Sequence, residues 1–377
     1  MMVLAHLTYT GSRFTLQLYA LKLTGSAYTV GILMSLLAVV PMFMSVHTGR
    51  WTDRVGPVKP ALIALCMLLT GALLPALTGN LPVQYVVPCL YLASALIGSG
   101  FMIGHIAVNN AVGTATTPAN RTQVFSQLAL GFSTSSMVGP VIAGFCIDHY
   151  GHRWTFLILS ASVVGSLTTW TIVRRRMPRA QAHTPPPGAR LADLLRIPQL
   201  RAVFVVSGMM SMAWDLFTFM VPLHGTRSGL SASTIGIIVG SFGVATFVVR
   251  AAIPSIMRRF TEWQTLTGAM VITACVYFIY PFFTSAPVLI GLAFVLGLGL
   301  GSSQPMVMTL LHLASPPGRA GESVGVRTTI MNASQTFLPL LFSVMGATLG
   351  VIPAFWMLAT FMTAGGWFAG HRKRAPA

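Results

Sequence analysis

HTGRWTDRVG, residues 47–56, is a short polar stretch between two long apolar runs, and it holds Asp53 beside Arg54. The chain has only six Asp and Glu residues in 377, so an acid in this place needs a reason. Each flanking run has about 20 residues, the length of helix that crosses a hydrocarbon core roughly 30 Å thick. The stretch is therefore expected at a turn between two membrane-spanning helices.

The composition is that of a membrane protein. Hydrophobic residues make up 54% of the chain and charged residues 8%, against roughly 25% charged in a soluble domain. We expect the first span to be a retained helix and not a cleaved signal peptide, because Arg13 interrupts it. Hydropathy predicts an all-α integral membrane protein with twelve transmembrane helices, at about 2–21, 29–48, 60–79, 84–110, 123–146, 154–173, 202–223, 231–254, 263–283, 287–312, 323–348 and 351–370.

The formal net charge of +17 reflects where the basic residues lie. If the N-terminus is cytoplasmic, 17 of the 23 Lys and Arg residues fall on the cytoplasmic side of the predicted helices. Such asymmetry is typical of a multi-pass membrane protein and attracts anionic lipid. We therefore expect the cell inner (plasma) membrane, both termini in the cytoplasm, and the lipid bilayer as a partner. Nucleic acid is not expected as a partner.

One long polar segment divides the predicted helices into six and six. Residues 174–201 are rich in Arg and Pro, which indicates a cytoplasmic linker. The predicted domains are an N-terminal six-helix bundle, 1–173, and a C-terminal six-helix bundle, 202–377.

The two halves also repeat each other in sequence. AYTVGI at 27–32 recurs as ASTIGI at 232–237. LIGSG recurs as VLGLG at an offset of 199 residues, which also aligns Pro140 with Pro339. A parallel repeat of six helices is found in transporters whose substrate site lies between the halves near the bilayer midplane.

The opening stretch matches a known pattern. Gly49-x-x-x-Asp53-Arg54-x-Gly56 resembles the signature loop of the major facilitator superfamily. Gly49 would allow close helix approach, Gly56 a tight turn, and Asp53 a contact with a positive helix end. The resemblance implies that Asp53 is a gating acid that helps to hold the cytoplasmic side shut. Where that family has basic residues directly after the second glycine, this chain reaches its next basic residue only at Lys59.

A second resemblance lies in SSMVGPVIAG, residues 135–144, which is similar to the Gly-Pro signature of exchangers in the same superfamily. Gly139, Pro140 and Gly144 would bend the helix and let it pack closely. The resemblance implies a fold of two pseudo-symmetric six-helix bundles and a place in the exporter-like branch for drug or metabolite efflux.

Arg13 and Asp215 are the two charges deepest in predicted spans. Each lies nine residues before the outer end of its helix, near Lys22 and His224, so both are expected about 13 Å below the outer surface. Because the two helices are symmetry mates in the resembled fold, we expect the pair to face the central cavity, bridging it or presenting a charge to the substrate. The alternative is a permanent interhelical ion pair with no role in transport.

Other polar side chains in predicted spans are candidates for substrate binding or proton coupling. The amides bond a neighbouring helix as readily as a solute. A histidine relays protons or stays neutral beside a partner. Arg250 and Arg327 lie near cytoplasmic helix ends, where their side chains can reach the interface. The candidates are Gln17, His105, Asn109, Trp214, Gln304, Asn332 and Gln335.

An enzyme is not expected. The chain has no Walker loop for ATP. His149 and His152 share a short loop, with no set of further ligands to complete a metal site. We expect no metal and no cofactor.

These observations predict a secondary transporter that moves a small organic solute by alternating access. The resemblance favours a monomer. Export coupled to protons by antiport is the first hypothesis. Uptake or facilitated transport of an organic anion is the second, because the predicted membrane interior holds three arginines against one clear acid. A transporter-like receptor without flux is the third.

Overall fold

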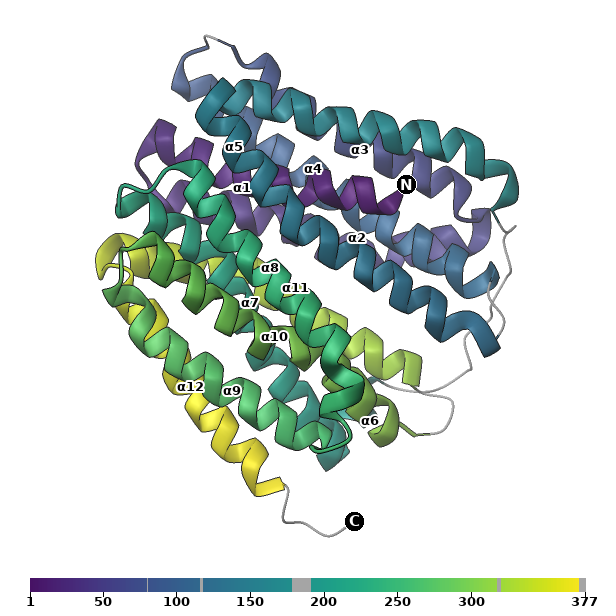
Figure 1. Ribbon diagram of the computed structural model, residues 1–377. Helices are drawn as coiled ribbons and strands as arrows, with labels where there is room; N and C mark the ends of the chain where they lie inside the picture. The colour runs from purple at the N-terminus through teal and green to yellow at the C-terminus, as the bar shows by residue number, and fades with distance from the viewer. Residues whose placement is uncertain (80, 116–117, 178–190, 317–319, 373–377) are drawn as a thin grey trace.

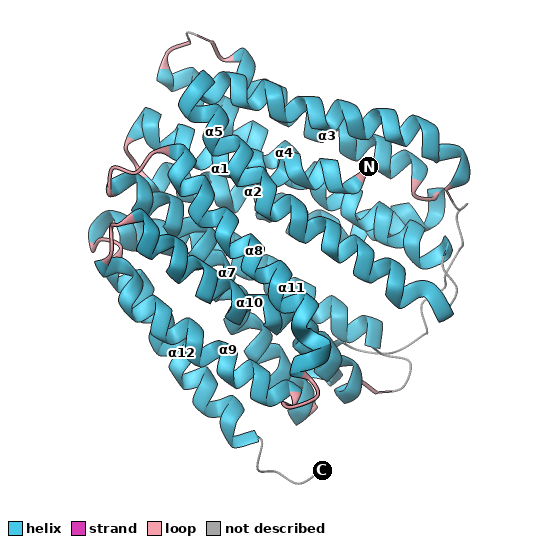
Figure 2. Cartoon of the chain, in the orientation of Figure 1, coloured by secondary structure: helices cyan, strands magenta, loops and turns pink. Residues whose placement is uncertain are grey.

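The computed structural model describes residues 1–79, 81–115, 118–177, 191–316 and 320–372. Every regular element in these ranges is helical (Figure 2). The longer helices are α1 (Met2–Thr24), α2 (Ala27–Val55), α3 (Val58–Leu77), α4 (Val83–Ala115), α5 (Pro118–Val173), α7 (Pro198–Arg227), α8 (Ala232–Ile256), α9 (Glu262–Ile279), α10 (Ala286–Ala314), α11 (Ala320–Thr348) and α12 (Ile352–Arg372). The shorter ones are η1 (Arg174–Arg176), α6 (Leu191–Arg196) and η2 (Tyr280–Phe282).

The twelve expected helices are all found in the described ranges. The element α5 breaks at Gly151, whose φ of 79° is not helical, so its two arms are separate helices. Ten elements of the described chain are long and apolar enough to cross a membrane, with α5 counted once. The remaining long helix, α1, is less apolar because it carries Arg13 and Lys22.

The polar stretch at residues 47–56 is more helical than hydropathy predicts. The α2 helix continues to Val55, whereas its apolar span was expected to end near residue 48. Hydropathy measures the length of chain in hydrocarbon, but the backbone hydrogen bonds of a helix can continue into the polar interface. Gly56 then ends the helix with a φ of 80°, a left-handed conformation that favours glycine.

The ends of the long helices gather at two opposite faces of the protein. The turns at Gly25, Gly151 and Gly229 lie at one end, which we call the hairpin face. Met1 and the beginning of α7 lie at the opposite end, which we call the termini face (Figure 1).

Two helix–helix contacts between the halves are related by the symmetry that the sequence repeat indicates. The α2 helix packs on α11, and α5 packs on α8. Gly31 of α2 lies against the Pro339 carbonyl, and Gly236 of α8 lies against the Pro140 carbonyl. Because the repeat aligns Gly31 with Gly236 and Pro140 with Pro339, these contacts are symmetry mates. The prediction of two pseudo-symmetric six-helix bundles is confirmed; much of the predicted linker, 178–190, lies outside the described residues, so the exact domain boundaries remain a prediction.

The halves make polar contacts near the hairpin face. The Asp148 carboxylate, at the end of the first arm of α5, accepts backbone N–H bonds from Ala232 at 3.1 Å and Ser233 at 2.7 Å. The Ser35 hydroxyl of α2 donates to the Thr336 carbonyl of α11 at 2.6 Å. Figure 1 shows the ribbons of the halves lying close at this face and diverging toward the termini face. The structure is therefore closed at the hairpin face.

Candidate functional site

Arg13 of α1 reaches across to the other half of the protein. One of its terminal nitrogens donates to the Thr218 hydroxyl of α7 at 3.0 Å. The Thr218 hydroxyl itself donates to the carbonyls of Trp214 and Asp215, at 3.1 and 3.2 Å. A neutral side chain on α7 thus holds the arginine from α1.

Asp215 lies one helical turn before Thr218 and is only 2% exposed. Its carboxylate accepts a hydrogen bond from the Ser334 hydroxyl of α11 at 2.7 Å. No Arg13–Asp215 ion pair within 4.0 Å is found in the described part of the chain. The direct bridge considered from the sequence is therefore absent in this conformation, because Thr218 takes the guanidinium and Ser334 takes the carboxylate.

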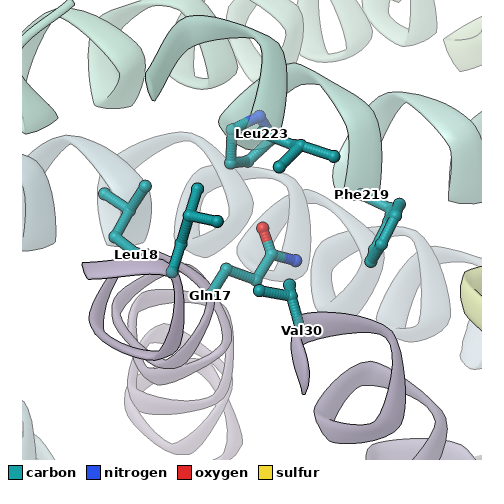
Figure 3. A pocket seen from close by; sticks show the side chains of 7 residues that line it. Gln17, Leu18, Val30, Phe219 and Leu223 are labelled. Atoms are coloured by element: carbon teal, nitrogen blue, oxygen red, sulfur yellow. The ribbon is translucent and has the colours of Figure 1, made fainter. Parts of the chain in front are cut away.

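Gln17, one turn beyond Arg13, joins the same contact between halves. Its amide nitrogen donates to the Thr218 carbonyl at 3.1 Å. Figure 3 shows this amide between the helices of the two halves, below Leu223. The space around it is too narrow for a water molecule and is lined by Gln17, Leu18, Leu21, Val30, Phe219, Pro222 and Leu223. On the hairpin side of Arg13 the interface is therefore sealed.

Trp214 belongs to an aromatic contact on α7 and α8. Its ring meets Phe242 edge to face, with centroids 4.8 Å apart. Phe217 stacks on the same Phe242 ring, with centroids 4.2 Å apart. Trp214 is half-buried, lies one turn before Thr218 on α7 and packs against α8.

His105 and Asn109 lie together on α4. The Asn109 amide nitrogen is 3.0 Å from Nδ1 of His105. The His105 ring lies 5.5 Å from Phe132 of α5 and 5.8 Å from Phe101 of α4. This environment matches the alternative of a histidine beside a local partner.

Sequence reasoning missed two members of this cluster, His6 and Tyr9 of α1. The His6 ring lies 4.9 Å from Phe132, and Tyr9 stacks on Phe101 at 4.2 Å. His6, Tyr9, Arg13 and Gln17 follow one another at helical spacing, so they form one stripe along α1. That stripe was the available signal.

The amides near the termini side lie in a different group. Arg250 of α8 donates to the Ser133 hydroxyl of α5 at 2.6 Å and to the Gln304 amide oxygen of α10 at 2.8 Å. Asn332 and Gln335 of α11 are half-buried. The α11 residue that reaches Asp215 is Ser334, which the sequence did not single out.

The two motif regions differ in packing. In the exchanger-like stretch, Gly139 lies against Gly11 of α1 and Gly144 against Ala232 of α8. At Gly49 no described atom lies within 4 Å of where a Cβ would stand. The close approach expected there is absent because the halves diverge at this face.

The gating motif has a described backbone but not a fully described set of side chains. Arg54 is exposed in the last turn of α2, and Gly56 ends that helix. The side chain of Asp53 lies outside the described residues.

Comparisons with known proteins identify the family. A family model described as Major Facilitator Superfamily matches residues 1–339. The chain is 24% identical over 330 residues to the class D tetracycline resistance protein of Salmonella ordonez, covering 83% of this chain and 78% of that protein. It is 23% identical over 353 residues to the multidrug resistance protein MdtG of Dickeya zeae, covering 91% and 85%.

A solved structure of the peptide transporter POT in complex with sulfate has the same fold, with a TM-score of 0.79 at 12% identity over 98% of this chain and 93% of that one. The family match indicates a multi-pass membrane protein of a transporter superfamily, not an enzyme, and the solved structure shows the same fold. With its two repeated six-helix bundles and the match over residues 1–339, the chain belongs to the Major Facilitator Superfamily.

Proposed function

We propose that the protein exports a small organic solute in exchange for protons. The observation that carries this proposal is the position of Asp215. Its buried carboxyl accepts a bond from α11 and lies one turn from the Thr218 that holds Arg13 of the other half. Movement of one half against the other changes the surroundings of this carboxyl. A carrier that couples a proton to a solute needs such a change.

The relatives support export. Their names refer to resistance against tetracycline and against several drugs. Removal of a toxic solute from the cell is one physical route to resistance.

The charge asymmetry supports an orientation. If the N-terminus is cytoplasmic, 17 of the 23 Lys and Arg residues fall on the cytoplasmic side of the predicted helices, so we place the termini face in the cytoplasm and the protein in the inner membrane. A structure closed at the hairpin face then takes up its solute from the cytoplasm. The contacts of α5 with α8 and of α2 with α11 must separate to release it outside.

The test is proton movement in proteoliposomes that contain a trapped pH dye. Tetracycline, 2-naphthoate and ethidium are added separately under an imposed pH gradient. The wild-type protein is expected to move protons with at least one of them, in the direction that exports solute from the termini face. Asp215→Asn removes the titrating group and is expected to abolish this coupled movement while exchange of solute for solute continues.

Asp193→Asn in α6 is the matched control, because it removes an acid outside the site. Full coupling in Asp215→Asn would move the search for the proton site to His105. Flux in the opposite direction would favour uptake, and no flux with any probe would favour a receptor. Restored coupling in the double variant Arg13→Gln with Asp215→Asn would show that the two charges serve only structure.

A further inference from the structure

Three arginines within the helical bundle donate hydrogen bonds to neutral groups of the described chain. Arg13 donates to Thr218 and Arg250 to Ser133 and Gln304. Arg327 donates from Nε to the Ser207 hydroxyl at 2.9 Å. Among the acids whose side chains the structure describes, Asp148, Asp193, Asp215 and Glu262, no oxygen lies within 4.0 Å of these guanidinium groups. A charge in a bilayer is costly, and a buried charge is ordinarily paired.

Two of these arginines also keep an unused donor. Nε of Arg13 and Nε of Arg250 are both buried, and neither has a hydrogen-bond partner. A buried N–H without an acceptor costs free energy, and more so on a charged group. An incoming anion would supply both the acceptor and the missing countercharge.

Aromatic rings lie on the termini side of Arg13, at about the level of Arg250. Arg13 is seven residues from His6, about 10 Å along α1, on the same stripe. The His6 ring contacts Phe132, and the neighbour of Phe132 in sequence is the Ser133 that holds Arg250. Arg13 therefore lies on the hairpin side of the ring cluster, and Arg250 lies at about the level of that cluster.

The rings offer a partly accessible surface. Tyr9, Phe101 and Phe132 are all half-buried, and they come from α1, α4 and α5. Aromatic pairs prefer offset-stacked or edge contacts, so the accessible parts of these rings suit contact with another planar ring. The cluster lies on the side of Arg13 away from the sealed space around Gln17.

We propose that the transported solute is an aromatic organic anion. Its acid group binds the Arg13 guanidinium, its ring packs against Tyr9, Phe101 and Phe132, and Arg250, on the termini side of Arg13, adds a second positive charge near the ring cluster. This substrate class rests on the proposed transport function and adds the charge and shape of the solute. A cationic solute would meet uncompensated arginines, and the one described carboxylate at this depth is buried against Ser334.

The test measures binding to the purified full chain by calorimetry with four probes. These are 2-naphthoate, the neutral 2-naphthamide, the cationic 2-naphthylmethylammonium and the saturated decalin-2-carboxylate. The first three share a ring system and differ in charge; the fourth keeps the charge and lacks the aromatic ring. We expect 2-naphthoate to bind at least about tenfold more tightly than the neutral and cationic probes, because a hydrogen bond to a charged group is worth that factor. It should also bind more tightly than decalin-2-carboxylate, which keeps the charge but loses the contact between aromatic rings.

Variants of Arg13 test whether this arginine binds the carboxylate of 2-naphthoate. Arg13→Gln is expected to weaken 2-naphthoate binding at least about tenfold, with no change for 2-naphthamide. Arg13→Lys keeps the charge and is expected to retain part of the affinity. Arg227→Gln, which removes a guanidinium bonded to the Gly346 carbonyl at the hairpin face, is the matched control and should bind like wild type.

Thr218→Val separates ligand binding from a structural role. It removes the partner of Arg13 and leaves the guanidinium in place, so 2-naphthoate binding should persist. If Arg13 only clamps α1 to α7, Thr218→Val and Arg13→Gln should weaken binding of all probes alike, and the proposal is wrong. The same conclusion follows from equal binding of the naphthyl probes, from preference for the ammonium, or from no binding of 2-naphthoate at its solubility limit.

Failure of this inference and failure of the proposed function give different results. Proton-coupled flux of ethidium without binding of 2-naphthoate would retain coupled export and reject the anionic substrate. Charge-selective binding of 2-naphthoate without pH-driven flux would retain the substrate class and reject coupling.

Discussion

At the scale of single residues, the site depends on a hydroxyl that separates two charges. Thr218 accepts from Arg13 while Asp215, one turn away, accepts from Ser334. A neutral partner holds an arginine less firmly than a carboxylate does, because it adds no attraction between opposite charges. Both charges therefore remain available to exchange partners when the halves move, which a tight ion pair would resist.

Asp53 provides a prediction at the same scale. Its place in the signature-like motif of α2 leads us to expect that it helps to close the termini face when the hairpin face opens. Asp53→Asn keeps the shape and removes the charge, so transport should fall at least about tenfold, corresponding to the loss of about 1.4 kcal/mol from the closed state, while insertion and folding stay normal. Flux per inserted molecule checks this, with Glu262→Gln at the start of α9 as the matched control. Wild-type flux in Asp53→Asn would contradict a gating role.

At the scale of helices, α5 and α8 form the closed side of the carrier. Gly144 and Gly236 allow their backbones to approach, and Asp148 at the end of the first arm of α5 caps the beginning of α8. A carboxylate at a helix N-terminus meets free N–H groups and the positive end of the helix dipole. The repeat aligns Asp148 with Ala347, so this cap exists on only one of the two symmetry-related contacts.

The Asp148 cap gives a pH-dependent prediction. Burial by itself would raise the pKa of this carboxyl, but hydrogen bonds from Ser233, Ala232 and Ser231 outweigh it and lower the pKa below its ordinary value. The ionised cap is therefore complete at neutral pH and is lost only as the pH falls through that lowered pKa. Asp148→Asn should weaken the closed hairpin face by about 1 kcal/mol, or roughly a fivefold shift toward opening at neutral pH.

Spin labels at Tyr150 and Leu349 measure that shift as a distance distribution, since both side chains are exposed at the hairpin face. The wild-type protein should approach the distribution of Asp148→Asn only in acid, below the ordinary carboxyl range. Lys22→Gln, which removes a charge of opposite sign near the same face, is the control. An unchanged distribution in Asp148→Asn at neutral pH would show that glycine packing closes this face without the cap.

At the scale of the whole molecule, the lengths of the apolar runs and the internal repeat predicted the helices and the two halves, but not the contacts of single residues. Twelve helices and the correspondence between the two halves follow from apolar run lengths and from the offset repeat, which can be read directly from the sequence. The rotation of each helix about its axis was not predictable, because each residue turns the helix by 100° and a helix surrounded by apolar groups has little amphipathic contrast. For this reason the sequence pointed to Asn332 and Gln335, while Ser334 between them reaches Asp215.

The orientation of the whole molecule is the final prediction, and the substrate route depends on it. The free energy that anionic lipid contributes, about 1 kcal/mol for each Lys or Arg near the surface, favours the termini face on the cytoplasmic side. In a background with the four native cysteines replaced by serine, a cysteine at Ala182 of the predicted linker should resist a membrane-impermeant maleimide in intact cells and react after the cells are opened. A cysteine at Ser228, beside the turn at Gly229, should react in intact cells and serves as the positive control. Reaction of the cysteine at position 182 in intact cells would show that the molecule has the opposite orientation. The arginines near the termini face would then draw an anion inward from outside, and the same site would serve uptake in place of export.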